Sequence, residues 1–295
     1  MKQKTEREAA MRKYDDKTLK KLQSVELEML HDFVDICSRY KIPYFGIGGT
    51  AIGALRHQGF IPWDDDIDLA FLRNDYEKFC RIVEKKYSDK YYILRYETNK
   101  NYPLFTARMC RKGTVFQEHA MKNVDCPFGI FLDLYAYDNV PDDEKQMKRQ
   151  AYAAWFYSKL LILCSIKEPN LVQLFGWKKK LALAACRVAY TIVKLLHIST
   201  DGVYYRGKKC CLKYNHQQTS RLAYLTEAKP YGSMIKREDL FPPIQLPFED
   251  LKLNFPNNMH EMMTAYYGDY MQLPPEDKRY NHCPYRLKFN EEEQD

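Results

Sequence analysis

The sequence predicts an α/β fold in which a sheet core is flanked by helices and a mostly helical segment is inserted in the middle. Short strand-like segments alternate with helical patterns through the first 145 residues, whereas residues 144–222 are almost entirely helical in pattern. The chain has 295 residues, of which 45% are hydrophobic and 29% charged. This length and composition allow a substantial core and exclude a disordered chain.

The first half of the chain carries most of the alternating elements. The expected helices are at 15–40, 50–56 and 75–87, and the expected strands are at 44–47, 66–71, 104–110, 114–118 and 128–135. Pro43 ends the first helix, and Asp75 is the expected N-cap of the third. Lys112-Gly113 is expected to join 104–110 and 114–118 as a hairpin. A further helix is expected at 257–267, near the end of the chain.

Several protein classes are excluded by composition. No apolar run approaches the roughly 18 residues of a membrane span, and the charged N-terminus has no apolar segment typical of a signal peptide. Nine cysteines are present without a CxxC spacing, which disfavours a disulfide scaffold or a zinc knuckle. We therefore expect a cytoplasmic protein in a reducing environment.

The charge divides the chain into three parts. We expect a catalytic core at 1–145, a basic helical segment at 146–222 and a C-terminal segment at 223–295 that closes the site. The middle part holds 14 basic and 2 acidic residues. Two interpretations stay open for 178–213: peripheral contact with an anionic membrane at its inner face, or an ordinary packed helix with a charged outside. No nucleic-acid partner is expected, because the basic residues lack an accompanying binding motif.

Two aspartates mark the candidate site. Asp66 and Asp68 are two residues apart, so on a strand both side chains point to the same face. Carboxylates about 4 Å apart repel by roughly 4 kcal/mol at an effective dielectric near 20. Bound Mg²⁺ or Mn²⁺ would relieve this repulsion and recruit phosphate groups. The alternative is a solvated acidic turn at 64–66, although Trp63, a candidate substrate contact, and an apolar strand flank it.

A glycine turn precedes these aspartates. Gly48, Gly49 and Thr50 lie between a strand and a helix, where free backbone N–H groups can hold a phosphate. The segment 46–51 also fits the G-x-G-x-x-A fingerprint of dinucleotide-binding proteins. The helix that follows is short for a crossover helix, since Gly59 and Pro62 end it, and this argues against that alternative.

Other polar residues are candidates for the same site. Asp133 lies within an apolar strand, where an unpaired carboxylate is costly, so it is a candidate third metal ligand or general base; an edge strand facing solvent is the alternative. Arg56 and His57 are candidate phosphate or sugar contacts, or else a helix C-terminal cation and a structural histidine. Arg108 either stabilises leaving-group charge or lies on a solvated face.

Three stretches together resemble the LicD family, which includes phosphocholine transferases and fukutin-type enzymes. They are YFGIGGTAIGALRHQGFIPWDDDIDLAF at 44–71, GIFLDLYAYDNVP at 129–141, and YYGDYMQLPPEDKR at 266–279, followed by His282. The resemblance implies a nucleotidyltransferase-like mixed sheet with flanking helices. It also implies that Gly48 and Gly49 hold phosphate, that Asp66 and Asp68 bind metal and that Asp133 is the third acid. His282 is a candidate substrate contact.

The resemblance implies a reaction as well. A CDP-alcohol, often CDP-choline, would donate its phospho-alcohol to a hydroxyl of a glycan or lipid-linked glycan, with release of CMP. Two other functions use the same residues: a nucleotidyltransferase that releases pyrophosphate, and a non-catalytic protein that binds nucleotide or glycan. The sequence leaves the alcohol and the acceptor open, because 24 tyrosines are too many to single out a choline cage.

Overall fold

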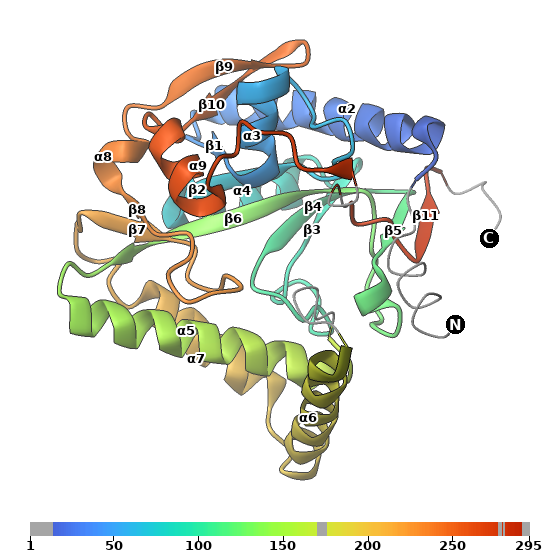
Figure 1. Ribbon diagram of the computed structural model, residues 1–295, viewed down its shortest axis with the longest axis vertical. Coiled ribbons are helices and arrows are strands. Elements are labelled where there is room, and N and C mark those ends of the chain that lie inside the picture. Colours follow the sequence, from blue (N-terminus) through green and yellow to red (C-terminus); the bar gives the residue numbers. More distant parts are fainter. Residues whose placement is uncertain (1–13, 170–175, 277–278, 280, 291–295) are drawn as a thin grey trace.

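The structure, a computed structural model, describes residues 14–169, 176–276, 279 and 281–290 (Figure 1). The helices are α2 (Asp16–Tyr40), α3 (Gly48–His57), α4 (Arg73–Lys86), α5 (Glu144–Ser165), α6 (Gly176–Leu195), α7 (Thr200–Leu212), α8 (Arg237–Leu240) and α9 (Met259–Tyr267), with a 3-10 turn at His119–Met121. The strands are β1 (Phe45–Gly46), β2 (Asp68–Leu72), β3 (Tyr91–Leu94), β4 (Ala107–Arg111), β5 (Val115–Gln117), β6 (Phe131–Val140), β7 (Arg221–Ala223), β8 (Ile235–Lys236), β9 (Ile244–Phe248), β10 (Leu251–Phe255) and β11 (Arg286–Lys288). The predicted mixed α/β fold is confirmed.

A curled mixed sheet forms the centre of the described chain. Its strand order is β1-β2-β6-β4-β3, with β7 paired to β6 and β8 to β7. Strands β2 and β6 are parallel, and the other pairs in this sheet are antiparallel. The long strand β6 therefore links the N-terminal part of the sheet to strands from the C-terminal third of the chain.

The alternation of side chains on β2 and β6 separates the core from the site. Leu69 and Phe71 on β2 are fully buried in the main apolar core with residues of α2 and α4. Leu132 and Leu134 on β6 enter the same core. Because successive side chains on a strand point to opposite faces, the residues between them face the other way. The site lies on that second face.

Local signals explain the first helix well. Asp15 caps α2 by accepting a hydrogen bond from the Thr18 amide at 2.9 Å. Buried residues follow at helical spacing, including Leu22, Met29 and Phe33. The helix ends at Lys41 in the left-handed conformation, just before Pro43.

Two local predictions are wrong. Strands β4 and β5 do not form a hairpin, since β4 pairs with β3 and β6, and β5 pairs with the C-terminal strand β11. Asp75 is not the N-cap of α4, because this helix begins at Arg73 and Asp75 lies in its first turn. Pairing with distant strands overrides the turn signal at Lys112-Gly113. Helix α4 begins directly where β2 ends, at Leu72, so its start does not depend on Asp75.

The three helices α5, α6 and α7 fill the basic middle segment. Figure 1 shows α5 and α7 side by side below the sheet, with α6 projecting beyond them. Asp143 caps α5 by accepting a hydrogen bond from the Gln146 amide at 2.9 Å. All nine cysteines are free.

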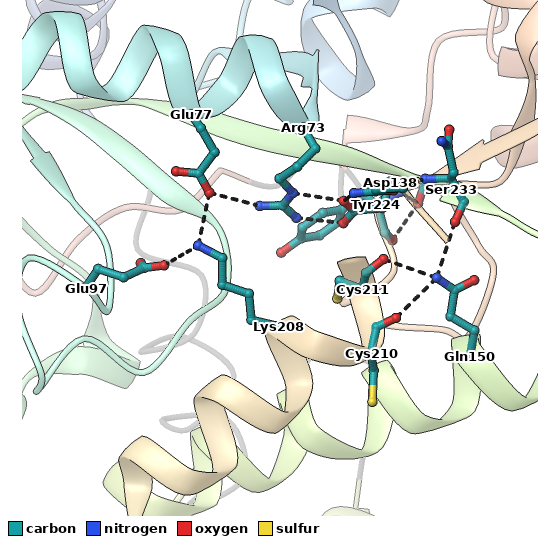
Figure 2. A network of polar contacts seen from close by, with 12 residues as sticks. Arg73, Glu77, Glu97, Asp138, Gln150, Lys208, Cys210, Cys211, Tyr224 and Ser233 are labelled. Atoms are coloured by element: carbon teal, nitrogen blue, oxygen red, sulfur yellow. Dashed lines mark hydrogen bonds and ion pairs between the residues drawn. The ribbon is translucent and has the colours of Figure 1, made fainter. Parts of the chain in front are cut away.

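A partly buried ion network ties this helical segment to the sheet (Figure 2). Arg73 of α4 donates from Nε and Nη2 to the two carboxylate oxygens of Asp138 on β6, at 2.9 and 2.6 Å. Lys208 of α7 bridges Glu77 and Glu97 at 3.0 and 2.7 Å. Because Asp138 is only 1% exposed, its charge depends on Arg73 for compensation.

Candidate active site

The parallel pairing of β2 and β6 brings together residues 65 positions apart in the sequence. Asp68 on β2 lies directly opposite Asp133 on β6. Asp66 stands just before β2, and one carboxylate oxygen from each of the three lies within 4.8 Å of the others. We call Asp66, Asp68 and Asp133 the acidic cluster. The edge-strand alternative for Asp133 is wrong, because β6 pairs with β2 on one side and β4 on the other.

Burial and mutual repulsion disfavour three negative charges in the acidic cluster. Burial, with the charges of Asp66 and Asp133, raises the pKa of Asp68 well above its ordinary value. Burial also raises the pKa of Asp66, to about 6, and the pKa of Asp133. A divalent cation would compensate these charges, and hard carboxylate oxygens suit Mg²⁺ or Mn²⁺. The acidic cluster therefore fits a metal site.

The glycine turn lies directly against these carboxylates. Gly48 has a φ of +55°, and a Cβ there would clash with Oδ2 of Asp68. A Cβ on Gly49 would lie 2.5 Å from Oδ2 of Asp64. The glycines thus let the first amides of α3, which have no carbonyl one turn earlier to bind, approach the acidic cluster. A phosphate held there would also be within reach of a metal.

Thr50 has a different place from the one predicted. Its side chain is 3% exposed, and its Oγ1 accepts a hydrogen bond from the amide of Asp68 at 2.8 Å. The hydroxyl is directed to the backbone of β2 rather than toward an open surface. Thr50 is therefore a positioning residue for Asp68.

Replacing Gly48 with Ala is expected to reduce turnover at least tenfold. Position 48 has a left-handed backbone conformation, which costs an alanine about 1–2 kcal/mol relative to its preferred conformation. The added Cβ also pushes the carboxylate of Asp68 away. Gly202→Ala in α7 is the matched control, because the nearest atom to its Cβ lies at 3.6 Å and its φ is not positive. Turnover and melting temperature should be measured for both. Equal activity of the two variants would contradict the close approach described here.

Arg108 is a buried partner of the acidic cluster. Its side chain is 6% exposed; Nε donates to Asp133 at 3.1 Å and Nη1 donates to Glu118 at 2.8 Å. The solvated-face alternative for Arg108 is therefore wrong. Glu118, the residue directly after β5, was not a predicted site residue, although its carboxylate helps to hold the guanidinium of Arg108 in place.

The acidic run at 64–66 is not a solvated turn. Asp65 is 1% exposed and accepts hydrogen bonds from the Tyr14 hydroxyl at 2.9 Å and from the His282 amide at 2.8 Å. Nδ1 of His282 lies 3.5 Å from Oδ2 of Asp66. The hydrogen bond with Asp65, together with the nearby carboxylates, raises the pKa of His282 to about 10. A C-terminal cation thus lies beside the acidic cluster.

A pocket of about 460 Å³ opens from Asp68 on the same face of the sheet. Its aromatic lining consists of five tyrosines, which are Tyr135, Tyr137, Tyr224, Tyr266 and Tyr267. Tyr135 and Tyr137 follow Asp133 at alternate positions on β6, so all three share a face. The lining also contains four carboxylates, Asp68, Glu227, Asp239 and Glu261, against one cation, Lys236. We call this the tyrosine pocket.

Comparison with known proteins identifies the family. The family model described as "LicD/FKTN/FKRP, nucleotidyltransferase domain" matches residues 41–167. The chain is also 32% identical over 283 residues to the lipopolysaccharide cholinephosphotransferase LicD of Haemophilus influenzae, covering 90% of this chain and 96% of the relative. The chain belongs to the LicD family. Uncharacterized proteins of Rickettsia typhi and Rickettsia prowazekii are 29% identical over 112 and 117 residues, or 38% and 39% of this chain and 35% and 40% of theirs.

The LicD-family match covers the acidic cluster but not all of the tyrosine pocket. Residues 41–167 include the glycine turn, all three aspartates and the buried Arg108. The pocket walls from the segment after β7 and from α9, including Tyr224 and Tyr267, lie outside this range. The sequence predicted that 223–295 closes the site but did not single out these tyrosines, because only the tertiary fold brings 224–239 and 261–267 to Asp68.

Arg56, His57 and Trp63 form a separate group in this LicD-family chain. Arg56 lies at the C-terminal end of α3, roughly 12 Å along the helix from Gly48. Its Nη1 donates to the carbonyl of Tyr270 at 2.8 Å, and its Nε donates to Nε2 of His57 at 2.9 Å. The guanidinium groups of Arg56 and Arg279 lie 5.8 and 4.7 Å from the Trp63 ring. The substrate-contact role of Arg56, His57 and Trp63 stays a prediction.

Proposed function

We propose that this chain transfers phosphocholine from CDP-choline to a hydroxyl group of a lipopolysaccharide-type glycan, with release of CMP. The observation that carries the proposal is the direct opening of the acidic cluster into the tyrosine pocket at Asp68. The LicD-family relative, named a lipopolysaccharide cholinephosphotransferase, supports both choline and the acceptor class.

The chemistry of the tyrosine pocket favours a quaternary ammonium group. Tyrosine rings attract a cation through their electron-rich faces, and a trimethylammonium group also presents apolar methyls. Tyr135 and Tyr224 meet edge to face with ring centroids 5.0 Å apart, and Tyr266 and Tyr267 lie 4.7 Å apart. The excess of carboxylates over cations adds a negative potential. A polyol would gain little from either feature.

The acidic cluster and the glycine turn then serve the diphosphate end. Asp66, Asp68 and Asp133 would hold Mg²⁺ or Mn²⁺, which supplies charge neutralisation for the diphosphate when bound. The amides of Gly48 and Gly49 bind phosphate oxygens, and the protonated His282 adds positive charge. Transfer of this kind depends on positioning and charge stabilisation more than on covalent help from the protein.

Asp133 serves the acceptor in this proposal. Its Oδ1 accepts the hydrogen bond from Arg108, and a carboxylate retains further acceptor capacity for the proton of the attacking hydroxyl. The acceptor oxygen forms a bond to the phosphorus that carries choline, and the bond from this phosphorus to the CMP oxygen breaks. Arg108 keeps Asp133 oriented during the step.

The donor preference tests this assignment. With Tyr267→Leu, we expect KM for CDP-choline to rise about tenfold, because the cation–π attraction of one ring is worth roughly 1–2 kcal/mol. Tyr267→Phe keeps the aromatic ring, so its KM for CDP-choline should stay within about threefold of the value for the original chain. CMP release should be measured with CDP-choline, CDP-ethanolamine and CDP-glycerol, each with Mg²⁺ and with EDTA.

The products distinguish the competing functions. Release of pyrophosphate from a nucleoside triphosphate, instead of CMP from CDP-choline, would identify a nucleotidyltransferase. Binding of CDP-choline in calorimetry without any turnover in the presence of glycan acceptors would identify a binding protein. Equal KM values for CDP-choline and CDP-glycerol would contradict the choline assignment while leaving the transferase class intact.

A further inference from the structure

Helix α6 is exposed over almost its whole length. Among its 20 residues, Gly176–Leu195, only Val193 is buried. Figure 1 shows this helix projecting from the lower end of the molecule, where it contacts α5. A globular protein normally buries one apolar side of such a helix, so its free surface needs an explanation.

The outward surface of α6 is apolar. Five large apolar residues are 48–71% exposed: Trp177, Leu181, Val188, Ile192 and Leu195. At 100° per residue, these positions fall within an arc of roughly 60°, on the side turned away from Val193. We call them the apolar stripe. The structure thus differs from a packed helix with a charged outside, the second interpretation that the sequence left open.

Positive charge runs along the apolar stripe. Lys180, Arg187 and Lys194 recur every seven residues and lie on one border of the stripe, by the same helical geometry. Arg187 pairs with the exposed Glu168 at 2.9 Å. Helix α6 itself contains five basic residues and no acidic residue. An apolar stripe with a cationic border is complementary to a layer with an apolar interior and anionic groups on its surface.

We propose that α6 lies in the surface of an anionic lipid membrane, with the apolar stripe inserted and its basic border on the headgroups. A second copy of this chain fits less well, because two such helices would bring like charges together. The arrangement also differs from a span. Within the described residues, no single helix has the length and apolar composition to cross a bilayer, and only α6 and α7 together meet those two criteria, bent by 109°.

The position of α7 favours a surface-bound α6 over a broken span. Helix α7 packs along α5, and its residues Val203, Tyr204, Gly207 and Cys211 are buried. Its Lys208 belongs to the ion network with Glu77 and Glu97. Insertion of α7 into lipid would break these contacts, whereas insertion of the apolar stripe alone breaks none of them.

Vesicle co-sedimentation of the full chain tests the proposal. The original chain should bind vesicles of phosphatidylcholine with 30% phosphatidylglycerol and bind pure phosphatidylcholine at least tenfold more weakly. The triple variant Lys180→Glu, Arg187→Glu and Lys194→Glu should lower the partition coefficient to the anionic vesicles roughly a hundredfold. Leu181→Ser, Val188→Ser and Leu195→Ser should lower it at least tenfold.

A matched control separates local from global charge. Lys17→Glu, Lys20→Glu and Lys85→Glu make the same charge change on exposed lysines of α2 and α4 and should leave binding within threefold. Melting temperatures check that each variant is folded. Three results would overturn the proposal: no binding of the original chain to anionic vesicles, equal losses with the control variant, or a lipid-free dimer that the serine variant converts to a monomer.

Discussion

Asp68→Asn is expected to lower CMP release by about a thousandfold or more, equivalent to roughly 4 kcal/mol in the activation barrier. Asp68 is the member of the acidic cluster that contacts both the glycine turn and the tyrosine pocket. A neutral amide of the same size preserves the packing but removes one of the charges that would hold a divalent cation. The measurement is CMP release from CDP-choline with Mg²⁺.

The same substitution should not weaken the fold. Burial, followed by repulsion from the charges of Asp66 and Asp133, raises the pKa of Asp68 well above its ordinary value. Removing one charge relieves this repulsion, so the melting temperature in EDTA should be equal to or above that of the original chain. Asp89→Asn, at an exposed position, is the control for both measurements. More than a tenth of the original activity in the Asp68 variant would contradict the assigned site.

Arg73→Met is expected to lower the free energy of unfolding by about 3–5 kcal/mol, because Asp138 is left buried without its main cationic partner. For a chain of this size the melting temperature should fall by about 5–8 °C. The network lies between α4, β6 and α7, so CMP release at low temperature should change little (Figure 2). Denaturant unfolding and thermal melting measure the effect.

Two further variants isolate the ion pair. Arg81→Met lies on the exposed side of the same helix and should change stability by less than about 0.5 kcal/mol. Arg73→Met combined with Asp138→Leu removes both charges and should recover part of the loss. If Arg73→Met has the same melting temperature as the original chain, the network does not hold the helical segment to the sheet.

Local patterns predicted much of the fold. The helix at 15–40, the strand–turn–helix around Gly48 and the helix near 257–267 are all present, within a few residues of their expected bounds. Each depends on contacts between near neighbours, such as the Asp15 cap and the helical spacing of apolar residues. The expected hairpin at 104–118 failed because strand pairing is a long-range property.

The candidate site shows the same division. Asp66 and Asp68 are close in sequence, so their proximity could be predicted, and Asp133 was found because an acid inside an apolar strand is costly. The buried state of Arg108 was not predicted, because it depends on Glu118 and on the pairing of β4 with β6. The solvated turn at 64–66, left open as an alternative, is wrong for Asp65, because Tyr14 and His282 donate hydrogen bonds to its buried carboxylate.

The sequence alone determined the α/β class, the resemblance to the LicD family and the acidic residues at the site, because each is encoded by residue type and short spacing. Only the tertiary structure decided how the three carboxylates meet, that five tyrosines gather beside them, and that α6 turns an apolar stripe outward. These features depend on which distant segments pack together and which faces they leave uncovered. Which segments pack together depends on apolar burial and charge pairing summed over the whole chain, so no local window of sequence contains these features.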